Sequence, residues 1–155
     1  MQEQSVEKSV LVTVDHIGLI VKDMEKAVSF YKSLGFGPFI SAGSGGNTER
    51  EIPGKSTDNI KYNIQMMQMG SLRVELIEPV SGDTPQKEFL DTRGEGVNHI
   101  SFRVDDFEKE AARLIEKGFK LTMKVKFKPN GGCVYLDSPQ AGGITLELLQ
   151  PPKRT

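Results

Sequence analysis

The sequence predicts an α+β fold made of two β-α-β-β-β modules with eight strands in all, because its two halves repeat one pattern. In each half a histidine opens a short apolar run, an acidic residue closes the run, and a helix-like pattern follows. A Gly-Phe pair comes next, and each half ends on a Glu-Leu-x-x-Pro motif. The matched pieces are Asp15-His16-Ile17-Gly18 and Asn98-His99-Ile100-Ser101, Gly35-Phe36 and Gly118-Phe119, and Glu75 to Pro79 and Glu147 to Pro151.

The positions of the repeats divide the chain into four segments. The chain is long enough for one good core, or for two small modules that share one, so a single structural domain is expected. The segments are a disordered tail at residues 1–9, a first module at 10–79, a linker with a short helix at 80–96, and a second module at 97–152.

The first module begins with a stretch from Val10 to Val21 that is rich in Val, Ile and Leu, which favours a strand. Asp23 suits the N-cap of a helix from Met24 to Leu34, and Gly35 is placed to end that helix in the left-handed conformation. Helical spacing places four apolar residues on one face of this helix: Ala27, Phe30, Tyr31 and Leu34.

An insertion separates this helix from the last strands of the first module. The segment Ser41 to Asn59 is rich in glycine and charge and is expected to be a mobile loop. A turn at Gly70-Ser71 separates two strands after the loop, and Pro79 to Glu95 then leads to the second module. The remaining elements expected are strands at Phe36 to Ala42, Ile60 to Met69 and Leu72 to Glu78, and a short helix around Pro85 to Leu90.

The second module repeats the order of elements. Asp105 or Asp106 is expected to cap its helix. Strict alternation from Phe119 to Lys128 is typical of a half-buried strand with its apolar residues on one face, and Asn130-Gly131 is a strong hairpin turn. The expected elements are strands at Val97 to Val104, Phe119 to Lys128, Val134 to Leu136 and Ile144 to Leu149, and a helix that ends at Lys117.

Composition excludes several classes of function. The formal net charge of −1 gives no electrostatic case for a nucleic-acid partner or an anionic membrane. No apolar run approaches the roughly 20 residues that span a bilayer. A single cysteine permits no intrachain disulfide, and the polar start from Met1 to Lys8 does not fit a signal peptide. A cytoplasmic protein is therefore expected.

Four residues in matched positions are the candidate site. The only two histidines of the chain, His16 and His99, occupy the same slot of the two repeats, and Glu75 and Glu147 occupy another. A lone strand histidine is more often a core residue, and a strand glutamate usually faces solvent. The coincidence of the four favours a shared site for one divalent ion such as Zn, Ni, Co or Mn, whose charge two carboxylates would neutralise.

The motifs quoted above, from residue 10 to residue 152, resemble those of the vicinal oxygen chelate superfamily, which includes glyoxalase I, methylmalonyl-CoA epimerase and extradiol dioxygenases. The stretches from Val74 to Ile100 and from Gly143 to Lys153 are most similar to the epimerases. The resemblance implies a curved eight-stranded sheet around a metal held by His16, Glu75, His99 and Glu147. The chain departs from the epimerase pattern in its longer insertion and in offering only Asn59, Asn63 and Gln65 where a second catalytic carboxylate is expected.

The resemblance implies a metal-dependent isomerase or epimerase that transfers a proton α to the carbonyl of a small carbonyl or thioester substrate. By similarity to glyoxalase I, Glu147 is expected to leave the metal and act as the base. Glu49 or Glu51, on the glycine-rich insertion, is the candidate for the second acid, against the alternative that both are solvated loop charges. A homodimer is expected, and the sequence leaves open whether the site closes within one chain.

Three other functions compete with the epimerase. A glyoxalase I-like lyase acting on thiol hemithioacetals would share the ligands. A non-catalytic binding protein of the same fold would take up a small molecule without chemistry. An extradiol dioxygenase fits less well, because its iron site uses two histidines and one carboxylate and a fourth ligand would fill a position that oxygen needs.

Overall fold

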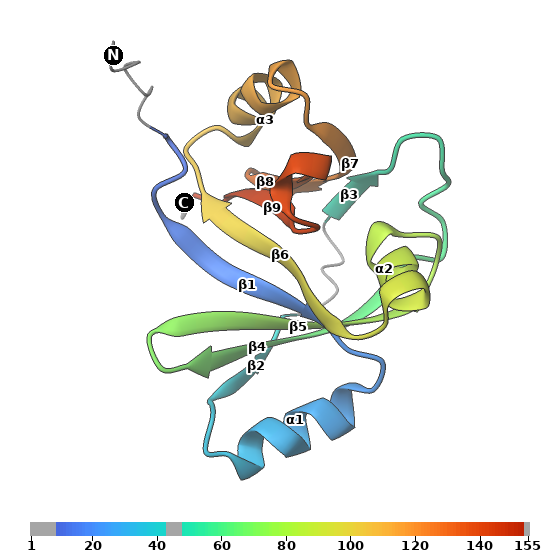
Figure 1. Ribbon diagram of the computed structural model, residues 1–155, viewed down its shortest axis with the longest axis vertical. Coiled ribbons are helices and arrows are strands. Elements are labelled where there is room, and N and C mark those ends of the chain that lie inside the picture. The colour runs from blue at the N-terminus through green and yellow to red at the C-terminus, as the bar shows by residue number, and fades with distance from the viewer. Residues whose placement is uncertain (1–8, 43–47, 154–155) are drawn as a thin grey trace.

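The computed structural model describes residues 9–42 and 48–153 (Figure 1). The expected tail therefore lies outside the described residues except for Ser9, as do residues 43–47 of the insertion. The first module comprises β1 (Val14–Ile20), α1 (Met24–Ser33), β2 (Phe39–Ser41), β4 (Lys61–Met69) and β5 (Leu72–Ser81). The second comprises β6 (Gly96–Arg103), α3 (Phe107–Glu116), β7 (Lys120–Phe127), β8 (Gly132–Asp137) and β9 (Thr145–Gln150). Three further elements are β3 (Thr48–Glu51), α2 (Pro85–Arg93) and a short 3-10 helix, η1 (Pro139–Ala141).

All described strands form one curled mixed sheet in the order β2-β4-β5-β1-β6-β9-β8-β7-β3 (Figure 1). In each module the first strand pairs in parallel with the last, β1 with β5 and β6 with β9. The antiparallel pair β1–β6 joins the modules at the centre of the sheet. The α+β class and the two β-α-β-β-β modules are thus confirmed, with nine strands in place of the expected eight.

The ninth strand, β3, lies in the insertion that was expected to be a loop. It pairs antiparallel with β7 and so extends the second module, although it belongs to the first half of the chain. Glu49 lies opposite Lys126 and Glu51 opposite Lys124, and opposite charges across a strand pair stabilise it. The expectation of a loop was wrong for residues 48–51, because their pairing partner lies more than 70 residues away in the sequence.

Two aspartates cap the long helices at matched positions. The side chain of Asp23 accepts a hydrogen bond from the Lys26 amide at the start of α1, and that of Asp106 accepts one from the Lys109 amide at the start of α3. Asp106, rather than Asp105, is therefore the second cap. Gly35 follows the C-cap Leu34 of α1 and has a φ of 84°, as expected for a helix that ends in the left-handed conformation.

Each of the two helices packs on the outer side of its own module and leaves the inner side of the curled sheet free. Helix α1 packs through Met24, Ala27, Val28 and Tyr31, and α3 packs through Phe107, Ala111 and Leu114. Phe30 and Leu34 were expected on the packed face of this helix, but they are 59% and 56% exposed. Of the helices in the described ranges, none has the length and apolar character that crossing a bilayer requires.

Strand β7 does not present a single apolar face. The pairing of β7 with β8 shifts register between Leu121 and Met123, which marks an irregularity of the β-bulge kind. Leu121 consequently packs with the α3 cluster on the outer side, whereas Met123 and Val125 pack with Ile52 and Tyr135. The alternation in the sequence is regular, but the bulge divides it between the two faces of the sheet.

Candidate metal centre

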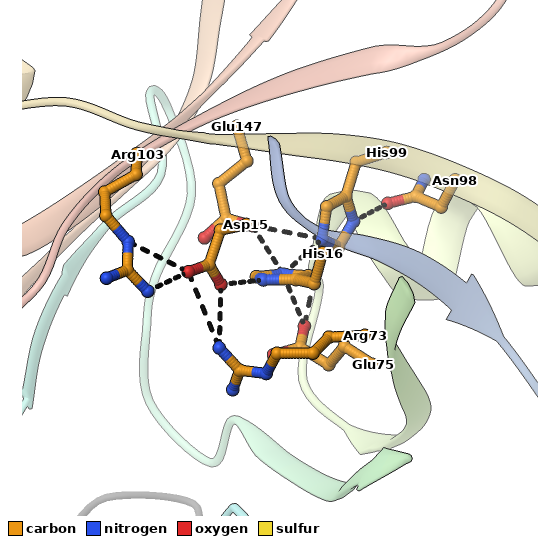
Figure 2. A network of polar contacts seen from close by, with 8 residues as sticks. All are labelled: Asp15, His16, Arg73, Glu75, Asn98, His99, Arg103 and Glu147. Carbon is orange, nitrogen blue, oxygen red and sulfur yellow. Dashed lines mark hydrogen bonds and ion pairs between the residues drawn. The ribbon is translucent and has the colours of Figure 1, made fainter. Parts of the chain in front are cut away.

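The four candidate ligands converge at the centre of the sheet (Figure 2). They come from four adjacent strands of one chain, with His16 on β1, Glu75 on β5, His99 on β6 and Glu147 on β9. The two imidazole Nε2 atoms lie 3.3 Å apart, and Glu147 Oε2 lies 3.1 Å from that of His16 and 3.0 Å from that of His99. Glu75 Oε1 is 3.8 Å from both. The site therefore closes within a single chain.

Strand register explains this convergence. The parallel pairs place Glu75 beside Gly18 and Glu147 beside Ser101, each two residues after the histidine of its own module. The antiparallel β1–β6 pair then sets Gly18 opposite His99 and Ser101 opposite His16. Each histidine thus faces a small residue of the other module, which leaves room for its ring.

The His99 ring occupies the space that a side chain at position 18 would fill, so only glycine fits there. A Cβ atom added there would lie 1.9 Å from His99 Cε1 and 2.4 Å from its Nε2, far inside van der Waals contact. Gly18→Ala is therefore expected to displace the His99 ring, to lower metal affinity at least about 100-fold as the loss of one ligand would, and to lower the melting temperature. Metal titration and thermal unfolding measure both effects.

Ser101→Ala is the control for this variant, because it changes the equivalent position opposite His16 without adding an atom. It is expected to keep the metal. A Gly18→Ala protein that bound metal with wild-type affinity would contradict the role assigned to this glycine.

The residue before each histidine orients its ring. Asp15 Oδ2 lies 2.7 Å from His16 Nδ1, and Asn98 Oδ1 lies 3.0 Å from His99 Nδ1. Both acceptors call for an N–H on Nδ1, so that each Nε2 directs its lone pair at the centre of the cluster (Figure 2). When both rings are neutral, two such lone pairs 3.3 Å apart cannot hydrogen-bond to each other, and a cation between them would satisfy both.

Asp15 is in turn held by two arginines of the flanking strands. Arg73 Nη1 lies 3.3 Å from its Oδ2, and Arg103 Nε lies 3.1 Å from its Oδ1, while Arg103 Nη2 also donates to Oδ1. The hydrogen bond with His16 is the largest influence on Asp15, and with the arginines it outweighs burial and lowers the pKa of Asp15 to about 2. The carboxylate is therefore ionised and fixed beside Nδ1 of the His16 ring.

Asp15→Asn is expected to lower metal affinity about 10- to 100-fold without unfolding the protein, because the carboxylate behind a ligating histidine fixes its ring and raises its basicity. Titration of the metal-free protein with Zn²⁺ against a competing chelator measures the change. Asp105→Asn, an equal change at an exposed turn residue, is the control. Equal affinity of the two variants would contradict the role of Asp15.

The charges of the cluster act on one another. Burial disfavours the charged imidazole of His16, but hydrogen bonds to Asp15 and Glu147 and the nearby carboxylate of Glu75 raise its pKa to about 10. Burial alone would raise the pKa of Glu147, but its contacts with the two histidines lower it well below the usual value. Burial raises the pKa of Glu75. The raised pKa of His16 favours a second proton on its ring, at Nε2, which a divalent cation would displace.

The residues present fit a divalent first-row metal. Glu147 Oε2 is fully buried, and the Nε2 atoms of His16 and His99 lie 3.1 and 3.0 Å from it, so that a cation among these three atoms would contact all of them. The ligand atoms of His16, His99 and Glu147 lie within 4.8 Å of one another, and the carboxylate of Glu75 lies beside them. Two imidazoles and two carboxylates are a donor set suited to Zn, Ni, Co or Mn.

A cavity of about 600 Å³ opens over this cluster. Its apolar walls come mainly from β4 and β7, with Ile64, Met66, Met123, Val125 and Phe127 among the lining residues. A volume of this size is typical of small-molecule sites. The cluster therefore lies where a substrate can reach it.

The structure does not bring Glu49 and Glu51 to the cavity. On β3 these two residues are exposed, whereas Thr48 and Arg50, which alternate with them, are partly buried and line the cavity. Glu49 Oε1 lies 2.5 Å from Lys128 Nζ on the outer side. The structure therefore does not place either residue where a second acid would reach the substrate, because alternation along β3, which the sequence did not predict, turns both outward.

Sequence reasoning missed several residues of the site. Asp15 could have been found, because it precedes His16 as Asn98 precedes His99, with a hydrogen-bond acceptor in each module. Arg73, Arg103 and Arg50 carry no comparable local signal, since their roles depend on strand pairing.

Comparisons with known proteins agree with this fold. The sequence profile of the Glyoxalase/Bleomycin resistance protein/Dioxygenase superfamily matches residues 15–136. The uncharacterized protein YqjC of Bacillus subtilis is 28% identical over 140 residues, covering 89% of this chain and 91% of that protein. Human mitochondrial methylmalonyl-CoA epimerase is 26% identical over 140 residues, covering 88% and 73%. The crystal structure of methylmalonyl-CoA epimerase from Mycobacterium tuberculosis has a TM-score of 0.67 at 23% identity, covering 97% and 95%, which shows a shared fold.

Proposed function

This chain belongs to the Glyoxalase/Bleomycin resistance protein/Dioxygenase superfamily, and on that premise we propose that it is a divalent-metal-dependent isomerase of the epimerase kind. It would transfer a proton at the carbon next to the carbonyl of an acyl thioester. The observation that carries the proposal is the convergence of His16, Glu75, His99 and Glu147 beside a cavity of about 600 Å³, which three of them line, all but His99. The similarity to methylmalonyl-CoA epimerases supports the substrate class.

In this proposal the four residues hold the ion, and one of them, Glu147, also acts as the base. A divalent ion held by the four residues would stabilise the negative charge that develops on the substrate carbonyl oxygen when the α-proton leaves. Glu147 would leave the ion to accept that proton, and the position of its side chain in the lining of the cavity supports this role. Asp15 and Asn98 hold the two rings in place through Nδ1.

A second candidate function is favoured by the carboxylates of the cavity. Among the described lining residues these are Asp15, Glu75 and Glu147, and Asp15 is engaged with His16 and two arginines. Epimerisation needs an acid on the face opposite the base, whereas an isomerisation that moves a proton between neighbouring carbons needs one base alone. The second candidate is accordingly a glyoxalase I-like lyase acting on a thiol hemithioacetal.

Hydrogen exchange with solvent tests both candidates. Metal-loaded protein in D₂O is incubated with one stereoisomer of methylmalonyl-CoA, and deuterium at the α-carbon and racemisation are followed by mass spectrometry and chiral analysis. The hemithioacetal of methylglyoxal and glutathione is assayed in parallel, and chelator-treated protein is the control for both. Metal-dependent exchange supports the epimerase, and thioester formation alone supports the lyase. Tight metal binding without either reaction would refute both and leave a non-catalytic binding protein.

Two expectations about the working protein belong to the same proposal. We infer a homodimer in the cytoplasm, and light scattering of the purified protein tests the first point. The exposed apolar side chains of Phe30, Leu34 and Ile40 support association. A monomer at micromolar concentration would contradict it.

A further inference from the structure

We propose that Arg50 binds an anionic group of the substrate, a carboxylate or a phosphate, inside the cavity of the metal centre. This inference deepens the proposed function and rests on it for the identity of the cavity as a substrate site. Arg50 belongs to β3, the strand that the repeat does not predict, so the insertion would supply substrate recognition to a site whose ligands all come from the repeated modules.

The backbone and a neighbouring ring hold Arg50 in place. Its pairing with Val125 of β7 sets its side chain toward the cavity, while Glu49 and Glu51 face outward. The guanidinium lies 5.5 Å from the centroid of the Tyr62 ring, within the range of a cation–π contact. Tyr62 belongs to β4, near the opposite end of the sheet, and its hydroxyl donates a 2.8 Å hydrogen bond to Gln86 Oε1. Arg50 is thus stacked on a fixed ring.

The positive charge of Arg50 has no carboxylate partner among the described residues. The other two arginines of the cavity, Arg73 and Arg103, both contact Asp15. On the outer side of β3, Lys128 contacts Glu49. A guanidinium is always protonated in proteins, and its fork of donors matches the oxygens of a carboxylate or phosphate. An arginine held in a cavity without an ion-pair partner is therefore suited to a ligand that brings the anion.

The charge balance of the whole cavity points the same way. Its described lining contains three arginines and three carboxylates, which offset one another. Two of these carboxylates, Glu75 and Glu147, belong to the metal cluster, so a bound divalent ion would leave the cavity with a net positive charge. A cavity of that charge attracts an anionic substrate and disfavours a neutral one.

Two parts of an acyl-CoA could supply the anion, and three probes distinguish them. Methylmalonyl-CoA has both the acyl carboxylate and the nucleotide phosphates. 2-Methylbutyryl-CoA lacks the carboxylate, and methylmalonyl-pantetheine lacks the phosphates. Binding of each to metal-loaded wild type, Arg50→Gln and Arg50→Lys is measured by calorimetry. Lys126→Gln is the matched control, because it removes a cation from the strand paired with β3 but outside the cavity.

We expect Arg50→Gln to weaken binding of methylmalonyl-CoA about 10- to 100-fold, the range for a charge-assisted hydrogen bond, with partial recovery in Arg50→Lys and no change in Lys126→Gln. If Arg50 binds the acyl carboxylate, the loss disappears for 2-methylbutyryl-CoA. If it binds a phosphate, the loss disappears for methylmalonyl-pantetheine. Equal affinity of wild type and Arg50→Gln for all three probes, or no binding of any probe to wild type, would overturn the inference.

The binding assay separates this inference from the proposed reaction. Arg50-dependent binding without exchange of the α-hydrogen would uphold the anion site and refute the isomerase. If wild type and Arg50→Gln exchanged the α-hydrogen at equal rates and bound substrate with equal affinity, the isomerase would be upheld and the anion site refuted.

Discussion

His99→Ala is expected to abolish stoichiometric binding of a divalent metal, whereas the wild-type chain is expected to bind a single ion. The His99 ring is fully buried, and its Nε2 lies within 3.3 Å of both His16 Nε2 and Glu147 Oε2. Structural zinc sites are worth roughly 10–16 kcal/mol, so that losing one of four ligands costs about 3 kcal/mol, or more than about 100-fold in affinity. Elemental analysis of purified and reconstituted protein measures the stoichiometry, and titration measures the affinity.

A matched pair on β5 controls for general effects of substitution. Glu75→Gln changes a member of the cluster, whereas Glu78→Gln makes the same change at a residue whose carboxylate accepts a hydrogen bond from Asn63. The first is expected to weaken metal binding and the second to leave it unchanged. No metal in the wild type, even after reconstitution, would remove the enzyme hypothesis altogether. Circular dichroism confirms that each variant is folded.

Glu147→Gln is expected to reduce exchange of the substrate α-hydrogen about 100- to 10,000-fold at saturating metal, because general base catalysis contributes on that scale. Glutamine keeps the size of the side chain and an oxygen that can face a metal, but its amide cannot accept the proton. The variant therefore removes the base while leaving the packing around residue 147 largely unchanged. Exchange in D₂O is followed by mass spectrometry, with the metal content verified in the same sample.

Glu49→Gln and Glu51→Gln complete this experiment. Both are equal changes of a carboxylate, and both residues lie exposed on β3, outside the lining of the cavity. They are expected to keep wild-type exchange. Full activity of Glu147→Gln would refute the role of the base, and a loss in Glu49→Gln or Glu51→Gln would show that β3 moves during the reaction.

These two predictions depend on different properties of the same cluster. Metal binding requires that the candidate ligand atoms converge, which follows from the register of four strands. Proton transfer requires in addition that one carboxylate face the substrate, and Glu147 lines the cavity. A protein that passed the first test and failed the second would be a metal-binding member of the superfamily with another task.

The sequence by itself determined the repeated architecture and the four residues that meet at the centre of the sheet. These features carry local signals that occur twice. The histidines open equivalent strands, the glutamates precede equivalent Leu-x-x-Pro endings, and Asp23 and Asp106 cap equivalent helices. When two modules of one kind pair through their first strands, equivalent residues lie at equal distances from the axis that relates them, so those on the central strands come close together. Matched positions in the sequence thus became neighbours in space.

Only the tertiary structure decided which residues surround that cluster. Residues 48–51 form a strand because they pair with β7, where Glu49 lies opposite Lys126 and Glu51 opposite Lys124. No local pattern in the sequence reveals this pairing. This pairing turned both glutamates outward and placed Arg50 in the cavity. The need for Gly18 opposite His99 likewise follows from the register of β1 with β6. Side-chain direction in a sheet depends on non-local pairing. The sequence alone can therefore name the four residues of the cluster but not the residues that line the cavity around it.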